Sequence, residues 1–549
     1  SIREKIDFSK QPMITENEKF IIAFNGEIYN TNRLKREFNL KVSSDSDSEI
    51  LNCLINLKGL DFIEYIKGMY AIIVYDKDNK SVHAYRDKSG QKNLYYLEEH
   101  NFFIISSEIH TLFESRILKK KVNYNSIYEA CSIGYNPNEN TIFSNIKKLL
   151  PGQKIEYRLS KNQIIKNFYE QKNNNFENAT IYESIDETIK NHLLSKSRIA
   201  INISGGLDSN IILHHSLKYR PEINLFCTYF EGANDEYNYD YKIASKIAKK
   251  FGLEVIKTNI TEKDYVEKFY DSFSLVEEPN RNIGNPGYYL NYINQSSKGF
   301  RSVLTGDGGD EIFVGYPWYR KGRFREFLYK YSYFFKLFKY PEVNNFYDNY
   351  ERYNSCKKFE DFFVFDKNQF NKKKLLNISK NNFESFLESS HQIKNIISWD
   401  KNKLVLDQFN WLSSEVLIRA DKLSMRQSLE VRNPFCDYDL RVKMLQDLNN
   451  FNFNSSINKK QIRDIYQKIL PSEVVSEKKK YGWRCPHNWM NNKIIKSLLI
   501  DLIPKKESAF FNWGKIKESL INNKISLMDR SIAPIISIVI LNDYHKLDI

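Results

Sequence analysis

The sequence predicts two units in series: a strand-rich α+β unit with two layers of sheet, followed by an α/β unit built on a parallel sheet. Short apolar runs separated by turn residues occupy the chain up to about residue 115. From residue 198 onward, strand-like and helix-like segments alternate. The polar stretch KNNNFEN (172–178) lies between these regions and has no periodicity. A chain of 549 residues also exceeds one compact core, because domains typically hold ~100–200 residues.

The first unit is predicted from short apolar runs of β-like composition. We place this unit at residues 1–120 and a connecting segment at 121–178, with helical patterning near Ile127–Cys131. The second unit then covers 179–549. The predicted strands of the first unit are Phe20–Phe24, Met69–Tyr75, Val82–Tyr85 and Phe102–Ile105.

The second unit is predicted from alternation of strands and helices, which indicates a parallel sheet with helices on both faces. Its helices are Ile211–Leu217 and a segment with Ile243, Ile247 and Phe251 on one face, ended by Gly252. Its strands are Arg198–Ile203, Leu225–Phe230, Glu254–Ile260 and Arg301–Leu304. Ligands of such sheets bind beyond the carboxyl ends of the strands. The aromatic-rich segment 317–400 is predicted to be helical, with its aromatic side chains as ordinary core.

Composition and charge exclude several classes of protein. The net charge is +14, but the lysines are dispersed in short groups rather than gathered in a stripe, which argues against a nucleic-acid partner. No run of ~18 apolar residues predicts a membrane span. The opening SIREKIDFSK lacks the apolar core of a secretory signal, so we expect a cytoplasmic protein. The six cysteines have neither zinc-site nor disulfide-framework spacing, so we expect reduced thiols.

The stretch INISGGLDSN (201–210) places two glycines, two serines and Asp208 in a turn between a strand and a helix. Free backbone N–H groups and the helix dipole favour an anion at such a junction. Glycines let the backbone approach oxygen atoms closely, and serine hydroxyls add donors. Asp208 would repel bare phosphate, which indicates a bridging Mg²⁺. The lysine of a Walker A loop is missing, so the pattern predicts a phosphate loop of a different kind.

A second glycine-rich loop, LTGDGGDE (304–311), follows the predicted strand Arg301–Leu304. In a parallel sheet, it would open at the same edge as the first loop. Three carboxylates among glycines repel one another unless a cation offsets their charge. We therefore expect Asp208 and Asp310 to bind Mg²⁺ together.

Two groups of motifs carry a resemblance to a known family. SGGxDS in a strand–loop–helix setting resembles the pyrophosphate loop of ATP pyrophosphatases, which cleave ATP to AMP and pyrophosphate. DKLSMRQSLEVRNPFCD (421–437) is similar to the DRxSMxxSLExRxPFxD segment of asparagine synthetases, with Lys422 in place of arginine. KKKYGW (478–483) resembles the RxKxGF segment of that family, with Lys478 in place of arginine.

The first unit resembles a class II glutamine amidotransferase domain, which precedes the synthetase domain in glutamine-dependent asparagine synthetases. The matching motifs are FNGEIYN (24–30), SDSE (46–49), RDKSGQKNLYY (86–96) and the pair Ser107–Glu108. The resemblance covers nearly the whole chain in the right order. It implies an N-terminal nucleophile hydrolase-like sandwich of two antiparallel sheets, followed by an α/β ATP-pyrophosphatase domain.

The resemblance also implies the roles of individual residues. Asp307 stands where many relatives have glutamate, near the acyl-adenylate, and Lys480 would place a cation on the phosphates and the developing oxyanion. Asp208 and Asp310 would hold Mg²⁺. The implied ATP-binding residues are Ile203, Ser204, Gly205, Gly206, Asp208, Ser209, Thr228, Thr305 and Gly306. The implied glutamine-binding residues are Asn25, Gly26, Glu27 and Asp47.

The glutaminase nucleophile of the family is expected to be missing from this chain. Relatives use a cysteine at their first residue, whereas this chain begins with Ser1. Its first cysteine, Cys53, falls in a predicted helix, Ile50–Leu57. Because Ser1 aligns with the interior of a strand, we expect the leading segment of that domain to be absent. As given, the chain would then not hydrolyse glutamine.

The predicted function is that of an asparagine synthetase-type amide ligase. ATP with Mg²⁺ would convert aspartate to an acyl-adenylate, and ammonia from glutamine or from solution would form the amide. One alternative is a relative that acts on another carboxylate, such as a sugar uronic acid in surface-polysaccharide synthesis or a β-lactam precursor. Two others are a tRNA-modifying ATP pyrophosphatase and a non-catalytic nucleotide-binding partner. The expected partners are small molecules, without nucleic acid or membrane, and a homodimer is left open.

Overall fold

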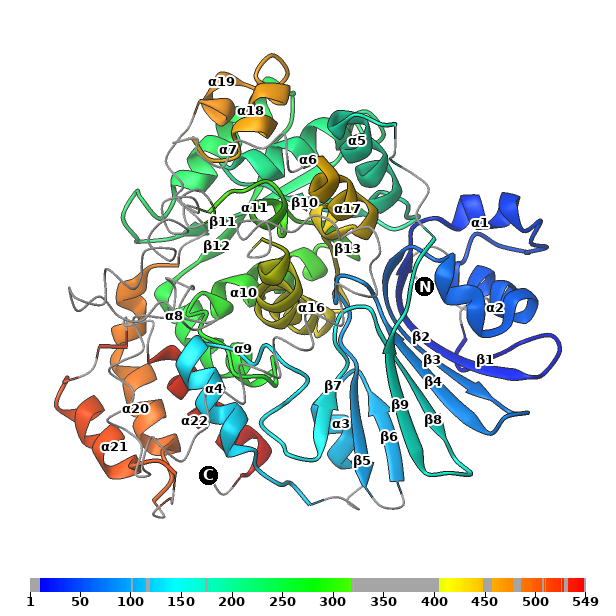
Figure 1. Ribbon diagram of the computed structural model, residues 1–549. Helices are drawn as coiled ribbons and strands as arrows, with labels where there is room; N and C mark the ends of the chain where they lie inside the picture. Colours follow the sequence, from blue (N-terminus) through cyan, green and yellow to red (C-terminus); the bar gives the residue numbers. More distant parts are fainter. Residues whose placement is uncertain are drawn as a thin grey trace, which may run out of the picture.

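Figure 1 shows a computed structural model in which two sheet-based units lie side by side. Among its described helices, none is both long and apolar enough to cross a membrane. The segment 317–400, which was predicted to be helical, lies outside the residues that the structure describes, except for Tyr319. The described residues are 10–99, 102–114, 119–172, 176, 178–316, 319, 404–447, 457–476, 485–505, 508, 510–524, 526–527 and 532–547.

The first unit contains two antiparallel sheets. The six-stranded sheet has the order β1 (Met13–Ile14), β2 (Phe20–Ile28), β3 (Gly68–Asp76), β4 (Ser81–Arg86), β8 (Gln153–Arg158) and β9 (Gln163–Phe168). The three-stranded sheet has the order β6 (Phe102–Ser106), β5 (Tyr95–Glu99) and β7 (Ile146–Lys148). All pairings in both sheets are antiparallel.

The two antiparallel sheets face each other across a shared apolar cluster that contains Ala71, Ala84 and Ile155 from one sheet and Tyr96 from the other. The rings of Phe103 and Tyr157 stack across this layer, with centroids 4.4 Å apart. Helices cover the outer face of the larger sheet (Figure 1). The helices of this unit are α1 (Thr31–Glu37), α2 (Asp47–Lys58), the 3₁₀ helix η2 (Gly59–Glu64), α3 (Ile109–Glu114) and α4 (Tyr124–Ile133). The predicted two layers of sheet are therefore present.

The first unit extends beyond residue 120, where the sequence led us to place its end. The expected connecting segment supplies β7, β8 and β9 to the two sheets. β7 spans only three residues, and β9 is mostly exposed or half-buried, so its apolar alternation is weak. The turn at Pro151–Gly152 resembles a linker in sequence, but it joins two parts of one sandwich.

The second unit is a three-layer α/β/α arrangement around a parallel sheet. All four strand pairings are parallel. The strand order is β12 (Val255–Ile260), β11 (Asn224–Phe230), β10 (Ile199–Asn202), β13 (Ser302–Leu304) and β14 (Glu430–Arg432). The four predicted strands and the predicted parallel sheet are confirmed, and β14 adds an edge strand that the sequence did not predict.

Helices cover both faces of this sheet. One apolar cluster joins the sheet to α5 (Ile181–His192), α6 (Leu207–Leu217), α7 (Tyr239–Lys250), α17 (Tyr438–Gln446), α18 (Lys460–Tyr466) and α19 (Ser472–Val475). A second cluster, on the other face, joins it to α10 (Asn285–Ser297) and α16 (Leu417–Met425). Residues that alternate along a strand, such as Ala200 and Ile201, enter opposite clusters, as expected of a strand buried on both faces.

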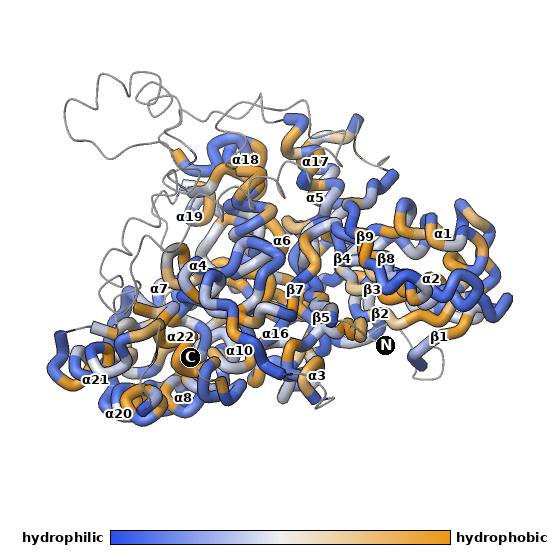
Figure 2. Tube along the Cα trace, turned by 60° about the horizontal axis from the view of Figure 1, so that its bottom comes forward, coloured by the Kyte–Doolittle hydropathy of each residue, from blue (hydrophilic) through white to orange (hydrophobic). Residues whose placement is uncertain are grey.

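Several of the remaining helices share a core cluster with both units. Apolar residues of α4 and of β5 belong to the same core cluster as α22. In Figure 2, blue and orange alternate along α20 and α21, as expected of helices with one buried face. The elements are α8 (Glu262–Glu267), α9 (Phe269–Ser274), α11 (Gly309–Ile312), the π-helix η7 (Gln408–Val416), the 3₁₀ helices η8 (Pro434–Cys436) and η10 (His487–Asn491), α20 (Lys493–Leu502), α21 (Trp513–Ile521) and α22 (Ala533–His545).

Candidate active site

The first glycine-rich loop lies between β10 and α6. The hydroxyls of Ser204 and Ser209 are 3.0 Å apart, and the Ser204 hydroxyl accepts a hydrogen bond of 3.1 Å from the Gly206 N–H. The Gly205 N–H donates to Asp240 Oδ1 at 3.1 Å. A Cβ at Gly205 would lie 3.1 Å from the Cβ of Ile243 on α7. Glycine at this position therefore allows close packing of the loop against α7.

The second loop lies beside the first, as expected from the adjacent parallel strands β10 and β13. A Cβ at Gly306 would lie 3.0 Å from the Cβ of Asp208, and one at Gly309 would lie 2.6 Å from its Cγ. Gly308 has a φ of 90°, which a side chain rarely permits. The two loops can meet only because small residues leave room for Asp208.

Lys459 joins the two loops, and sequence reasoning missed it. Its ammonium pairs with Asp208 Oδ2 and lies 2.9 Å from Asp310 Oδ1. Burial alone would lower the pKa of Lys459, but Asp208 and Asp310 together raise it above its ordinary value. Lys459 is therefore charged, and the two aspartates share one cation.

The donor set at this point fits Mg²⁺. Asp208 and Asp310 offer carboxylate oxygens, the ligands that Mg²⁺ prefers. Both side chains are partly exposed, at 18% and 17%, so an incoming ion can reach them. The ammonium of Lys459 already demonstrates that one cation can contact both carboxylates. A divalent ion would compete with this lysine for the same oxygens.

Asp307 lies in the same loop, where Thr305 donates a hydrogen bond of 2.9 Å to its Oδ2. Burial raises the pKa of Asp307, and the nearby Arg419 guanidinium only partly offsets this effect. Arg419 lies over the ring of Tyr288 at 4.2 Å, and its Nε is 3.8 Å from Glu415 Oε1. Sequence reasoning did not identify Arg419 or Glu415 as neighbours of the site.

The other predicted ATP-binding residues lie on or next to neighbouring strands. Ile203 follows β10, and its N–H donates to Phe226 O of β11 at 2.9 Å. Thr228 lies on β11 and is buried. The Thr305 N–H donates to Arg432 O of β14 at 3.0 Å. Lys480 and Lys478 fall outside the described residues, so the role of Lys480 stays a prediction.

The predicted glutamine-binding residues gather on β2 and at the start of α2. A Cβ at Gly26 would lie 2.1 Å from Met69 O, so β2 and β3 approach closely there. Asp47 Oδ2 accepts from the Ile28 N–H at 3.4 Å. Glu27 is only 2% exposed, and its Oε2 lies 3.2 Å from the guanidinium of Arg432 in the second unit. No pattern in the sequence predicted this pairing. Asn25 is opposite Ala71 on β3.

Buried ion pairs join the two units at several points. The RDKSGQKNLYY motif supplies Lys92, which is 2.8 Å from Asp421 of α16. Lys67 pairs with Asp439 of α17. These pairs, together with Glu27–Arg432, cross from the antiparallel sandwich to the parallel-sheet unit. The motif segments that carry the resemblance therefore meet at this interface.

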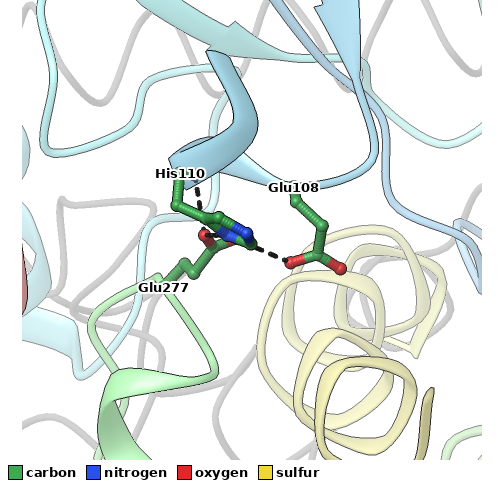
Figure 3. A group of neighbouring side chains, drawn as sticks. All are labelled: Glu108, His110 and Glu277. Carbon is green, nitrogen blue, oxygen red and sulfur yellow. Dashed lines mark hydrogen bonds and ion pairs between the residues drawn. The ribbon is translucent and has the colours of Figure 1, made fainter. Parts of the chain in front are cut away.

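A further ionic group, shown in Figure 3, surrounds Glu277. Its Oε1 lies 2.7 Å from His110 Nδ1, and its two oxygens accept the Ile109 and His110 N–H groups at the start of α3. Glu108, His110 and Glu277 are close enough to ligate one metal ion. However, the ammonium of Lys422 lies 2.7 Å from Glu108 Oε2 and 2.6 Å from Glu277 Oε2. A lysine thus supplies the positive charge of this cluster.

Comparison with known proteins agrees with this architecture. Residues 1–170 match the family described as glutamine amidotransferase domain, and residues 180–528 match asparagine synthase. Asparagine synthetase [glutamine-hydrolyzing] 1 of Bacillus subtilis is 24% identical over 98% of this chain and 87% of its own length. A putative asparagine synthetase 2 of Methanocaldococcus jannaschii is 29% identical over 58% of this chain and 63% of its own. Asparagine synthetase B of Escherichia coli is 23% identical over 58% and 56%.

Proposed function

The chain belongs to the asparagine synthase family, and we propose that it is an ATP-dependent amide ligase that forms asparagine from aspartate. In the first step, an oxygen of the acid attacks the α-phosphorus of ATP, and pyrophosphate leaves. In the second step, ammonia attacks the acyl carbon, AMP leaves, and one proton is released. The observation that carries this proposal is the meeting of Asp208, Asp310 and Lys459 where two glycine-rich loops touch.

The loop residues would act by positioning and charge neutralisation. The N-terminus of α6, with the hydroxyls of Ser204 and Ser209, suits an anion. Lys459 would supply positive charge beside the phosphates, and Lys480 a second charge. When bound, Mg²⁺ would offset the charge of the departing pyrophosphate next to Asp208 and Asp310.

Asp307 would accept a proton during the second step. A general base works best when its pKa lies near the working pH, and burial raises the pKa of Asp307 in that direction. Thr305 would orient the carboxylate, because it donates to Oδ2. An aspartate reaches less far than the glutamate of many relatives, so the acid would bind closer to the loop.

Ammonia would come from glutamine or from solution, and glutamine is the donor that the first unit would bind. Asn25, Gly26 and Asp47 would bind it, and Glu27 would share its charge between the glutamine ammonium and Arg432. The pairing of Glu27 with Arg432 links this strand to β14, and the backbone of β14 contacts Thr305 of the second loop.

The test is acid-dependent release of pyrophosphate by the full chain. The chain is supplied with ATP, Mg²⁺ and ammonium chloride, together with aspartate or with a panel of uronic acids. We expect release and a mass-identified amide with aspartate. Release only with a uronic acid would overturn the substrate assignment and favour the polysaccharide-type relative.

Two variants make the test specific to the loops. Asp208→Asn keeps the size of the side chain but removes its charge, so pyrophosphate release should fall by about 100-fold. Asp78→Asn is the matched control, because Asp78 is an exposed partner of Lys19, distant in sequence from both loops. Full activity of Asp208→Asn would contradict the proposed ATP site.

A further inference from the structure

A chain of hydrogen bonds, partly exposed at Asp186 and buried beyond it, joins α5, α6 and α18. Asp186 Oδ1 of α5 lies 2.5 Å from His215 Nδ1 of α6, and His215 Nε2 lies 2.6 Å from the hydroxyl of Tyr466 on α18. His215 and Tyr466 are fully buried. Asp186 also accepts from Lys218 at 2.7 Å and from Tyr219 at 2.6 Å. The proposed chemistry uses none of these residues.

The partners of Asp186 and His215 determine which atoms of this hydrogen-bonded group donate and which accept. Hydrogen bonds from Lys218, Tyr219 and His215 outweigh partial burial and lower the pKa of Asp186 to about 2. Asp186 is therefore an acceptor, and His215 Nδ1 must carry the proton. Burial lowers the pKa of His215 to about 4, so its Nε2 is unprotonated at neutral pH. The Tyr466 hydroxyl then donates to Nε2.

Lys459 and Tyr466 belong to one short block of chain. Lys459 directly precedes α18 with a φ of 53°, and its carbonyl accepts from the Arg463 N–H at 2.9 Å. The Arg463 guanidinium binds Asn458 O at 2.9 Å and Val475 O at 2.6 Å. Because these bonds tie the block together, a shift of Tyr466 would carry Lys459 with it.

The block contacts α6 at two points with the same spacing. Lys459 pairs with Asp208 in the first turn of α6, and Tyr466 bonds His215 in the last turn. Asp208 and His215 are seven residues apart, as are Lys459 and Tyr466. Seven helical residues span about 10 Å. The bond at His215 therefore fixes the register in which Lys459 reaches Asp208.

We propose that Asp186, His215 and Tyr466 are positioning residues that set α18 on α6 and so hold Lys459 between Asp208 and Asp310. This inference rests on the proposed function, in which Mg²⁺ and the ATP phosphates come to the same aspartates. Lys459 competes with the metal for the carboxylates and must be delivered to the phosphates. The buried chain sets how firmly Lys459 competes.

The direct test measures the reactivity of Lys459 in the full chain without nucleotide. Tyr466→Phe removes one hydroxyl and leaves the ring in its apolar surroundings. A buried hydrogen bond contributes about 0.5–1.5 kcal/mol, so labelling of Lys459 by an amine-acylating reagent should rise about 2- to 10-fold. Lys460, which is half-exposed and pairs with Asp464, provides the internal reference in mass spectrometry.

A second readout is affinity for Mn²⁺, used in place of Mg²⁺ and measured by electron paramagnetic resonance. Loosening Lys459 should tighten Mn²⁺ binding by a similar factor and raise KM for ATP more than it lowers kcat. A merely structural role would lower the thermal midpoint without tightening metal binding. Unchanged labelling and unchanged Mn²⁺ affinity in Tyr466→Phe would overturn the inference.

Matched variants separate the effect of the hydrogen bonds among Asp186, His215 and Tyr466 from the effect of their surroundings. His215→Asn keeps a donor toward Asp186 and loses the contact with Tyr466, so it should match Tyr466→Phe, and the double variant should add nothing. His214→Gln is the control for the hydrogen bond, because His214 bonds Tyr182 at 2.9 Å and meets Tyr466 only through a ring contact, with centroids 6.3 Å apart. If even the unaltered chain releases no pyrophosphate, the proposed function fails, while labelling and Mn²⁺ binding still decide this inference.

Discussion

Two lysines of this protein lie between pairs of carboxylates, and they differ in what else surrounds them. Lys422 contacts Glu108, Glu277 and the carbonyl of Ser107, and its side chain is 1% exposed. Lys459 contacts Asp208 and Asp310, and its own side chain is also buried, at 6% exposed. The first ammonium has an acceptor for each of its three protons. Among the described residues, the ammonium of Lys459 contacts two acceptors, the carboxylates of Asp208 and Asp310.

The comparison indicates that the pattern of charges alone does not identify a functional site. Around Lys422, one carboxylate comes from the first unit and one from the second, and Glu277 also caps the start of α3 (Figure 3). That cluster locks the units together. Around Lys459, the carboxylates lie in the first turns of α6 and α11, where the proposed function places Mg²⁺, so the lysine would exchange with the metal ion. The number of acceptors around each lysine and the elements that carry them, rather than composition, separate the two roles.

The largest expected effect follows from removing the positive charge of the cluster formed by Lys422, Glu108 and Glu277. Lys422→Met leaves Glu108 and Glu277 without their cation, and breaking a buried pair in this way costs about 3–5 kcal/mol. We expect the free energy of unfolding, measured by urea titration, to fall by that amount. The folded fraction should keep its rate of pyrophosphate release, because Lys422 does not reach the loops.

Lys19→Met provides the control for this loss. Lys19 pairs with Asp78 at 3.1 Å, and both side chains are substantially exposed. Exposed pairs contribute at most about 1 kcal/mol. If Lys422→Met and Lys19→Met unfold at the same urea concentration, the interpretation of the cluster as a lock is wrong.

The next largest effect comes from the cluster formed by Lys459, Asp208 and Asp310. Lys459→Met removes the cation beside the phosphates, and we expect pyrophosphate release to fall by about 100-fold. Stability should change little when Mg²⁺ is present, since the ion can take the place of the ammonium between Asp208 and Asp310. The thermal midpoint, measured with and without Mg²⁺, checks this substitution.

Lys460→Met is the neighbouring control, because its partner Asp464 is exposed and lies one turn further along α18. Mg²⁺ should raise the midpoint of Lys459→Met more than that of Lys422→Met, in which Lys459 still competes for the two aspartates. If Mg²⁺ raised the thermal midpoints of both variants equally, the proposed distinction between the Lys459 cluster and the Lys422 cluster would be wrong.

A smaller effect is the pH dependence of the free energy of unfolding that His215 contributes. The pKa of His215 is about 4 when folded, against an ordinary value near 6.5. Between these values the unfolded chain binds the proton and the folded chain does not, so this contribution to stability is lost as pH falls from 6.5 to 4. His215→Asn should reduce the slope of unfolding free energy by up to about 1.4 kcal/mol per pH unit. An unchanged slope in urea titrations across this range would contradict the assignment.

Sequence patterns predicted much of the fold because buried strands have strong apolar runs. Phe20–Phe24, Met69–Tyr75 and Leu225–Phe230 became β2, β3 and β11 with small extensions. β8 and β9 were missed, since nine of their twelve residues are exposed or half-buried. Short strands with polar alternation cannot be distinguished from connections without knowing which sheet they join.

The candidate site was predictable where glycine and aspartate stand in a fixed order. The meeting of Asp208 and Asp310 was expected from parallel strands. Lys459 was not, because it is one of many dispersed lysines and reaches the loops from 149 residues beyond Asp310. Lys459 reaches Asp208 and Asp310 only because α18 packs against α6, which the sequence does not reveal. In the same way, nothing near Glu27 in the sequence predicts Arg432 as its partner.

The smallest expected effect concerns the exchange of lysine for arginine, the residue that the family pattern has at position 422. Arginine has a planar fork of five donors, whereas the three acceptors around Lys422 converge on one point. Lys422→Arg should therefore lower the free energy of unfolding by about 1 kcal/mol through crowding. Around Lys459 the acceptors are two partly exposed aspartates, so Lys459→Arg should be accommodated more easily, with a stability within about 0.5 kcal/mol of the unaltered chain. Urea titrations of the two variants side by side measure the difference. An equal loss at both positions would mean that Lys459 is as tightly enclosed as Lys422, and that exchange with a metal ion at the two aspartates requires α18 to move first.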